Sequence, residues 1–243
     1  MSSAAEVVSL ANKLGDALDG SAVENVPGAL PRLAEILAGE TDAEVIAAAV
    51  GALGLGWDFQ AAQIILDHVR IDHPDADVRL AVAQSLPCGV DVDGPVGAAV
   101  MEARITLTRD EETDVRDWAC CGLGQINAFC LAARDALAAR LDDADDDTRC
   151  EALLALAQAG DRRAATDLQR RLAFVDDEMI CLLEIRAAAE LADPQLHPLL
   201  WRLRDEWAGD DDELTKEFTT ELACAISRRR PEQKVQGSTH AQS

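Results

Sequence analysis

Apolar residues recur every three or four positions along most of the chain, and short polar runs interrupt them at regular intervals. This spacing puts the apolar side chains on one face of an α-helix, whereas a strand would alternate apolar and polar residues. Acidic residues at predicted starts, and Gly or Pro at predicted ends, divide the pattern into segments. The pattern predicts helices over residues 4–18, 31–38, 43–55, 60–69, 76–86, 94–107, 112–126, 132–141, 145–159, 164–174, 177–191, 197–207 and 211–227.

One unit recurs in the second helix of each predicted helix pair. The aligned positions are Val45, Val78, Val115, Thr148 and Ile180, spaced 32 to 37 residues apart. The positions four and eight residues later are also mostly apolar, so each of these helices offers the same stripe. A period of this length indicates a solenoid, in which stacked helix pairs share one continuous core.

Three segments carry a resemblance to a known family. Asp75 to Leu86, Glu112 to Gly124 and Asp145 to Leu156 resemble the second helix of HEAT repeats, closest to the short HEAT-like repeats also found in phycocyanobilin lyases. The resemblance covers about residues 28–228. It implies an all-α fold, a right-handed α-α superhelix with about six helix pairs plus an N-terminal capping helix. We expect one solenoid domain over residues 1–228 and a disordered polar tail over residues 229–243.

At three of these helix starts an acidic residue precedes an arginine by four positions. The pairs are Asp75 with Arg79, Glu112 with Arg116, and Asp145 with Arg149. Side chains four residues apart meet on a helix surface, so we expect ion pairs within each helix. The resemblance to HEAT repeats implies, in addition, a ladder of Asp and Arg between neighbouring repeats. The acidic run over residues 142–147 lacks the Gly and the last Glu of a calcium loop, so we expect a turn between helices.

The formal net charge is −23, and Lys occurs at only three positions. Such a negative field disfavours nucleic acid and anionic membranes as partners and favours a basic protein. A compositional bias of the host would produce the same charge without a functional meaning. Residues 1–20 do not resemble a signal peptide and no apolar run reaches the length of a membrane span, so we expect a cytoplasmic protein. The seven Cys form no Cys-x-x-Cys motif, and we interpret them as reduced core residues.

No catalytic, cofactor-binding or metal-binding motif is present in the sequence. His–Glu pairs, which bind metal in HEAT-like deoxyhypusine hydroxylases, do not occur. Gly122 and Gly124 are interpreted as a helix end and not as a phosphate-binding loop. We therefore predict a protein-binding scaffold or adaptor without a cofactor, and not an enzyme. Two alternatives stay open: an enzyme or enzyme subunit of the lyase-like HEAT type, and an acidic immunity or inhibitor protein that blocks a basic toxin.

Trp118 is the leading candidate for a binding residue. The other units have Ala48, Ala81, Glu151 and Leu183 at the aligned position. Second helices line the concave face of HEAT repeats, where a tryptophan can anchor a partner. The candidate site residues on or near this face are Trp118, Asp117, Asp114, Asp77, Asp147 and Glu151. The competing interpretation is that Trp118 fills space in the widest repeat. Trp201 and Trp207 are expected in the core of the last repeat.

Overall fold

The computed structural model describes residues 3–18, 28–56, 59–86, 94–126, 130–173, 180–206 and 213–227, and every regular element in these ranges is a helix. The helices are α1 (Ala4–Leu18), α2 (Ala29–Gly39), α3 (Ala43–Gly54), α4 (Phe59–His68), α5 (Ala76–Ser85), α6 (Pro95–Leu107), α7 (Thr113–Ile126), α8 (Leu131–Ala138), α9 (Asp146–Gln158), α10 (Arg162–Ala173), α11 (Leu182–Leu191), the short 3-10 helix η1 (Pro194–Leu196), α12 (His197–Glu206) and α13 (Glu213–Ser227). None of the described helices has both the length and the apolarity needed to cross a bilayer.

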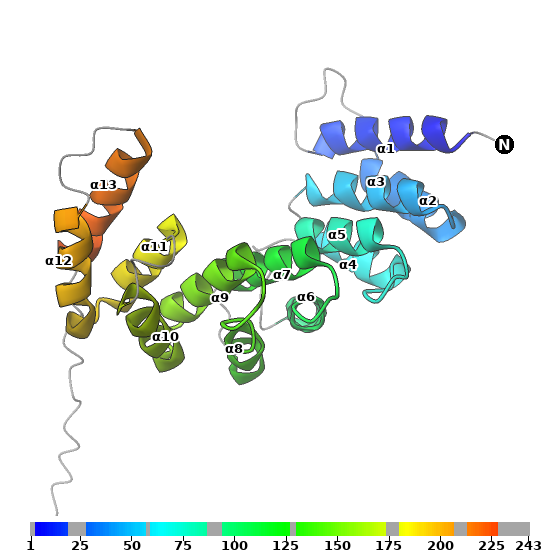
Figure 1. The fold of residues 1–243 in the computed structure, drawn as a ribbon. Helices are drawn as coiled ribbons and strands as arrows, with labels where there is room; N and C mark the ends of the chain where they lie inside the picture. The colour runs from blue at the N-terminus through cyan, green and yellow to red at the C-terminus, as the bar shows by residue number, and fades with distance from the viewer. Residues whose placement is uncertain are drawn as a thin grey trace, which may run out of the picture.

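After α1, the helices in the described ranges form six pairs, from α2 with α3 to α12 with α13. The odd-numbered helices pack on one another in chain order, and the even-numbered helices form a second, more open row. Figure 1 shows the odd-numbered row on the inner side of an arc, with α1 and α13 at its two ends. This arrangement confirms the α-α solenoid with a capping helix and six helix pairs.

The predicted apolar stripe forms the core. Val45, Val78 and Val115 are at most 1% exposed, and so are the leucines eight residues after them. The close approach of α3 and α5 depends on Gly54, because a Cβ atom there would lie 2.7 Å from Ser85 Cβ. The core is therefore continuous from one unit to the next, as nearest-neighbour packing requires.

Acidic N-caps start the second helices of three units. The side chains of Asp42, Asp75 and Asp145 each accept a hydrogen bond from a backbone N–H in the first turn of α3, α5 and α9. A carboxylate in this place satisfies a free N–H and interacts favourably with the helix dipole. These helix starts agree with the sequence prediction.

The fifth unit has a different register from the predicted one. Its second helix, α11, begins at Leu182 with Cys181 as N-cap. Counted from the N-cap, Glu184 and not Ile180 is the equivalent of Val45. The shift is four residues, about one helical turn, so Ala188 still faces the core and is 1% exposed. Trp207 and the predicted tail over residues 229–243 lie outside the described residues.

Candidate protein-interaction surface

Two arginines join neighbouring units at the starts of α5 and α7. Arg79 donates from Nε and Nη2 to the two carboxylate oxygens of Asp110, at 2.8 and 3.0 Å. Arg116 makes the same bidentate contact with Asp143, at 3.0 and 2.8 Å. The prediction that these arginines pair with Asp75 and Glu112 in their own helices is therefore wrong. The ladder between repeats, which the HEAT resemblance implies, is confirmed. Arg149 forms an ion pair with Asp146, three residues earlier, instead of the expected pair with Asp145.

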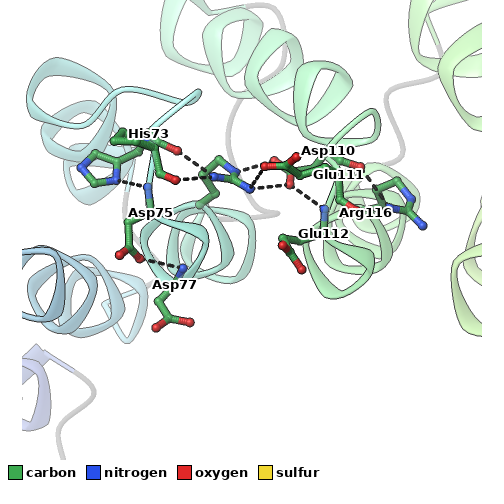
Figure 2. Close-up of polar contacts among 9 residues, drawn as sticks. His73, Asp75, Asp77, Asp110, Glu111, Glu112 and Arg116 are labelled. Atoms are coloured by element: carbon green, nitrogen blue, oxygen red, sulfur yellow. Dashed lines mark hydrogen bonds and ion pairs between the residues drawn. The ribbon is translucent and has the colours of Figure 1, made fainter.

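Each ladder aspartate also shapes the turn before the next helix. Oδ1 of Asp110 accepts the backbone N–H of Glu112 at 3.0 Å, as Figure 2 shows, and Asp143 does the same with residue 145. In the joint between α3 and α5, His73 takes the aspartate's place, and its Nδ1 accepts the N–H of Asp75 at 3.1 Å. Ile46 stands where the arginine would be. This joint, which we call the first joint, therefore has no arginine rung.

A buried arginine fixes the position of α7. Arg104, on α6, is 2% exposed and donates hydrogen bonds to the backbone carbonyls of Ala83, Leu86 and Trp118. The first two carbonyls lie at the end of α5 and the third in the middle of α7. A guanidinium has enough donors to satisfy several acceptors at once. One side chain thus ties three helices together directly behind Trp118.

Residue 122 must lack a side chain, because the Arg104 guanidinium packs against it. A Cβ atom at residue 122 would lie 1.5 Å from Arg104 Nη1. The helix continues through Gly122 and Gly124 to Ile126, so the interpretation of these glycines as a helix end is wrong. Sequence analysis missed this contact, although an arginine in an apolar stripe facing a mid-helix glycine is a signal for it.

The side chain of Trp118 is exposed. In the inner row α7 packs between α5 and α9, with α6 behind it, so its exposed side chains face the inner side of the arc. Trp118 is 42% exposed there. Asp114 lies one turn earlier on the same face and is also exposed. Trp118 therefore does not fill the core of its repeat.

Two carboxyl groups lie half-buried between α7 and α9. Burial, together with the charges of Asp147, Asp145 and Asp114, raises the pKa of Asp117 to about 6. Burial and the charge of Asp117 raise the pKa of Glu151 to about 7. Oδ1 of Asp117 is buried without a hydrogen-bond partner among the described residues. These carboxyl groups are poorly stabilised in their charged form, since no cation accompanies them.

The structure brings five of the six candidate residues together on α7 and α9. We call Asp114, Asp117, Trp118, Asp147 and Glu151 the inner acidic patch. Within the described part of the chain, no ion pair with Arg or Lys involves its carboxylates. Asp77 is exposed in the first turn of α5, one helix away from the patch.

A cavity of about 270 Å³ lies beside the patch and is lined by residues of α7 and α9 that include Cys121, Gln125, Glu151 and Gln158. Burial and the charge of Glu151 raise the pKa of the Cys121 thiol to about 12. The pKa of Cys120 is raised as well, mainly by burial. Both thiols are thus protonated at neutral pH, whereas a nucleophilic cysteine needs its thiolate.

The comparisons with known proteins agree with this geometry. The family of HEAT repeats matches residues 101–180. The solved structure of YibA from Escherichia coli is 20% identical with a TM-score of 0.62, over 90% of this chain and 82% of that chain. Two engineered proteins are each 19% identical. One has a TM-score of 0.57 over 92% of this chain and 62% of its own, and the other 0.51 over 89% and 94%. No curated protein sequence gives a significant match.

Residues 101–180 are HEAT repeats, and the described part of the chain has the fold of a HEAT-like solenoid. The matched region, residues 101–180, contains Asp110 and Asp143, the two aspartates of the ladder, and the whole inner acidic patch. At these identities the solved structures establish the fold alone.

Sequence analysis interpreted all seven cysteines of this HEAT-like protein as reduced core residues, and the structure corrects this interpretation. Cys150 of α9 and Cys181, the N-cap of α11, form a disulfide. Cys130 is free and exposed, Cys120 is free and buried, and Cys88 lies outside the described residues. The exposed Trp201, at 47%, likewise corrects its expected place in the core.

Proposed function

We propose that this HEAT-like repeat protein is an interaction scaffold or adaptor that binds a basic segment of a partner protein on the inner acidic patch. Repeat solenoids are typical interaction proteins, because their curvature creates an extended concave surface. The observation that carries the proposal is Trp118, an exposed aromatic side chain in the middle of the inner row with carboxylates around it. Tryptophan is enriched among the residues that dominate binding energy.

The patch offers a basic segment two kinds of contact. Burial of the exposed part of Trp118 contributes on the order of 1–2 kcal/mol from apolar area. An Arg or Lys over the indole face adds about 0.5–2 kcal/mol. A cation at this place would have the Asp114 carboxylate one turn away on α7 and the carboxylates of Asp147 and Glu151 on the neighbouring helix α9. Aromatic and ionic contacts therefore favour the same partner side chain.

The raised pKa values support a cationic partner. Asp117 and Glu151 repel each other and lack a cation in the free protein. A bound ammonium or guanidinium favours their charged forms and lowers both pKa values. Binding near neutral pH would then release protons, and the protein's net charge of −23 would speed association at low salt.

A binding role also fits the chemistry of the patch better than catalysis. The pKa of Cys121, beside the patch, is raised to about 12, so the lyase-like alternative lacks an activated thiol here. The described group of side chains with metal-ligand geometry is Cys150, Cys181 and Glu184, which belongs to α9 and α11 and not to the patch.

The test compares the wild-type chain with two tryptophan variants as baits in extracts of the native host. Trp118→Ala removes the inner tryptophan, and Trp201→Ala is the matched control, because Trp201 is also exposed but lies on α12 of the outer row. We expect the wild type and Trp201→Ala to capture the same basic proteins. Trp118→Ala should bind these proteins at least tenfold more weakly, and high salt should release them. Titration calorimetry with each purified prey then measures the affinity directly. Acidic prey, or equal binding by both variants, would refute the proposal.

A further inference from the structure

The disulfide joins two consecutive inner-row helices. Cys150 is 3% exposed in α9, and Cys181 lies 31 residues later, at the start of α11. The other cysteines in the described part of the chain are free. The bond therefore links the fourth unit to the fifth, across the joint that connects the ladder-bearing middle of the solenoid to α11, α12 and α13.

Cys181 stands where α3, α5 and α9 have an N-cap aspartate. Asp75 and Asp145 hold the first turns of α5 and α9 through their carboxylates. A thiol is a much weaker hydrogen-bond acceptor. The start of α11 is held by Glu184 instead, whose Oε2 accepts the Cys181 backbone N–H at 2.9 Å, and by the sulfur–sulfur bond. Loss of that bond leaves the fifth unit with the weakest start among these three helices.

A metal is the competing explanation for the same residues. The ligand atoms of Cys150, Cys181 and Glu184 all lie within 4.8 Å of one another. The Glu184 carboxylate is already engaged on both oxygens, since Oε1 accepts a hydrogen bond from Arg171 and Oε2 accepts the N–H of Cys181. A divalent cation would have to displace a guanidinium from a carboxylate that is 1% exposed. These contacts favour the disulfide over a metal site.

We propose that Cys150 and Cys181 form a redox-dependent cross-link that fixes the C-terminal arm of the solenoid, α11 to α13, on α9 when oxidised and releases the start of α11 when reduced. A small disulfide such as oxidised glutathione supplies the oxidant. The Cys181 thiolate, from the less buried cysteine, attacks it, breaks its sulfur–sulfur bond and expels one glutathione thiolate. The Cys150 thiolate then attacks the Cys181 sulfur and expels the second. Two protein thiols lose two electrons and two protons, and the oxidant becomes two thiols.

Differential alkylation of the full-length chain tests the bond without any variant. The chain is incubated with oxidised glutathione or with dithiothreitol, alkylated, and digested for mass spectrometry. We expect a linked peptide pair containing Cys150 and Cys181 after oxidation, and alkylation of both after reduction. Free thiols at both positions after oxidation would overturn the proposal, and so would stoichiometric zinc, detected by a zinc-sensitive dye, that is released when the thiols are modified.

Thermal unfolding tests the consequence for the fold. The oxidised wild type is expected to melt roughly 5–10 °C above the reduced form, because the cross-link restricts the unfolded chain. Cys150→Ser and Cys181→Ser should each abolish this difference, and their hydrogen exchange in the first turn of α11 should match that of the reduced wild type. Cys130→Ser, which removes an exposed free thiol, is the matched control and should retain the difference. A redox-dependent melting temperature that survives in both single variants would refute the cross-link.

Discussion

Substitution of Gly122 by alanine is expected to destabilise the protein severely, because the new Cβ atom would lie 1.5 Å from Arg104 Nη1. Arg104 is 2% exposed, and moving its guanidinium aside breaks the hydrogen bonds that it donates to buried carbonyls. If the guanidinium leaves its place, the carbonyls of Ala83 and Leu86, at the end of α5, lose their donor, whereas the Trp118 carbonyl keeps its hydrogen bond within α7. Each unsatisfied buried acceptor costs about 1–3 kcal/mol, and the helix propensity of alanine returns at most about 1 kcal/mol.

The expected net loss is about 3–5 kcal/mol in the free energy of unfolding, or on the order of 10 °C in Tm. Circular dichroism during heating and urea titration measures it. Gly51→Ala is the matched control, since Gly51 is also inside a helix and a Cβ atom there meets nothing within 4 Å. That variant should be more stable than the wild type by about 0.5–1 kcal/mol.

A double-mutant cycle identifies the cause. In an Arg104→Ala background, Gly122→Ala no longer meets the guanidinium and should cost nothing. An equal loss in both backgrounds would show that the clash is not the reason. A loss as small as the effect of Gly51→Ala would refute the geometry itself.

Four further predictions test the ladder, the patch and the core. Asp143→Asn leaves its arginine partner buried and unpaired, and should lower the free energy of unfolding in urea titration by about 3–5 kcal/mol. The control Asp146→Asn changes a side chain that is 79% exposed and should lower it by less than about 1 kcal/mol. Equal losses would contradict the ladder. The pKa of Glu151 rises from 4.5 to about 7 on folding, so the folded state binds the proton more tightly, and stability should fall as pH rises from about 4.5 to 7. Glu151→Gln should flatten this part of the plot of Tm against pH and raise Tm above neutral pH. An unchanged plot would contradict this prediction. Trp118→Ala should lower Tm by only a few degrees, because the side chain is 42% exposed, and a loss like that of a buried tryptophan would place it in the core. Leu123→Asp should abolish cooperative unfolding, since it buries an unpaired charge at a position that is 1% exposed, and a cooperative melt would refute this.

The architecture was predictable because local signals and periodicity agree. Asp42, Asp75 and Asp145 each begin an inner helix, and the apolar stripe behind them is buried as expected. The same local signals could not identify the partners of long side chains. Arg79 reaches over the next turn to Asp110, 31 residues later, which four-residue spacing does not reveal. Asp110 and Asp143 each lie five residues before the first aligned position of their helix, Val115 and Thr148. This shared position would have identified them as the acceptors of the ladder arginines.

The candidate surface was predictable only in part. Helical register places Asp114 and Trp118 on one face, and the structure confirms that they share it. The half-buried state of Asp117 depends on how closely α9 approaches α7, and the sequence does not encode that distance in any local pattern. The pairing of Cys150 with Cys181 was missed for a related reason. The predicted helix start at residue 177 gave the fifth unit the wrong register, and the structure starts α11 at Leu182.

The first joint, without its arginine rung, makes the solenoid respond unevenly to temperature. The stability of a repeat protein is approximately a sum of unit terms and coupling terms between neighbours. Coupling between α3 and α5 comes from apolar packing, with Gly54 pressed against Ser85, and apolar attraction weakens on cooling. The joints at Asp110 and Asp143 carry buried ion pairs, whose desolvation penalty falls on heating. We therefore expect cooling to weaken the first joint more than the joints at Asp110 and Asp143, and heating to weaken those two joints less.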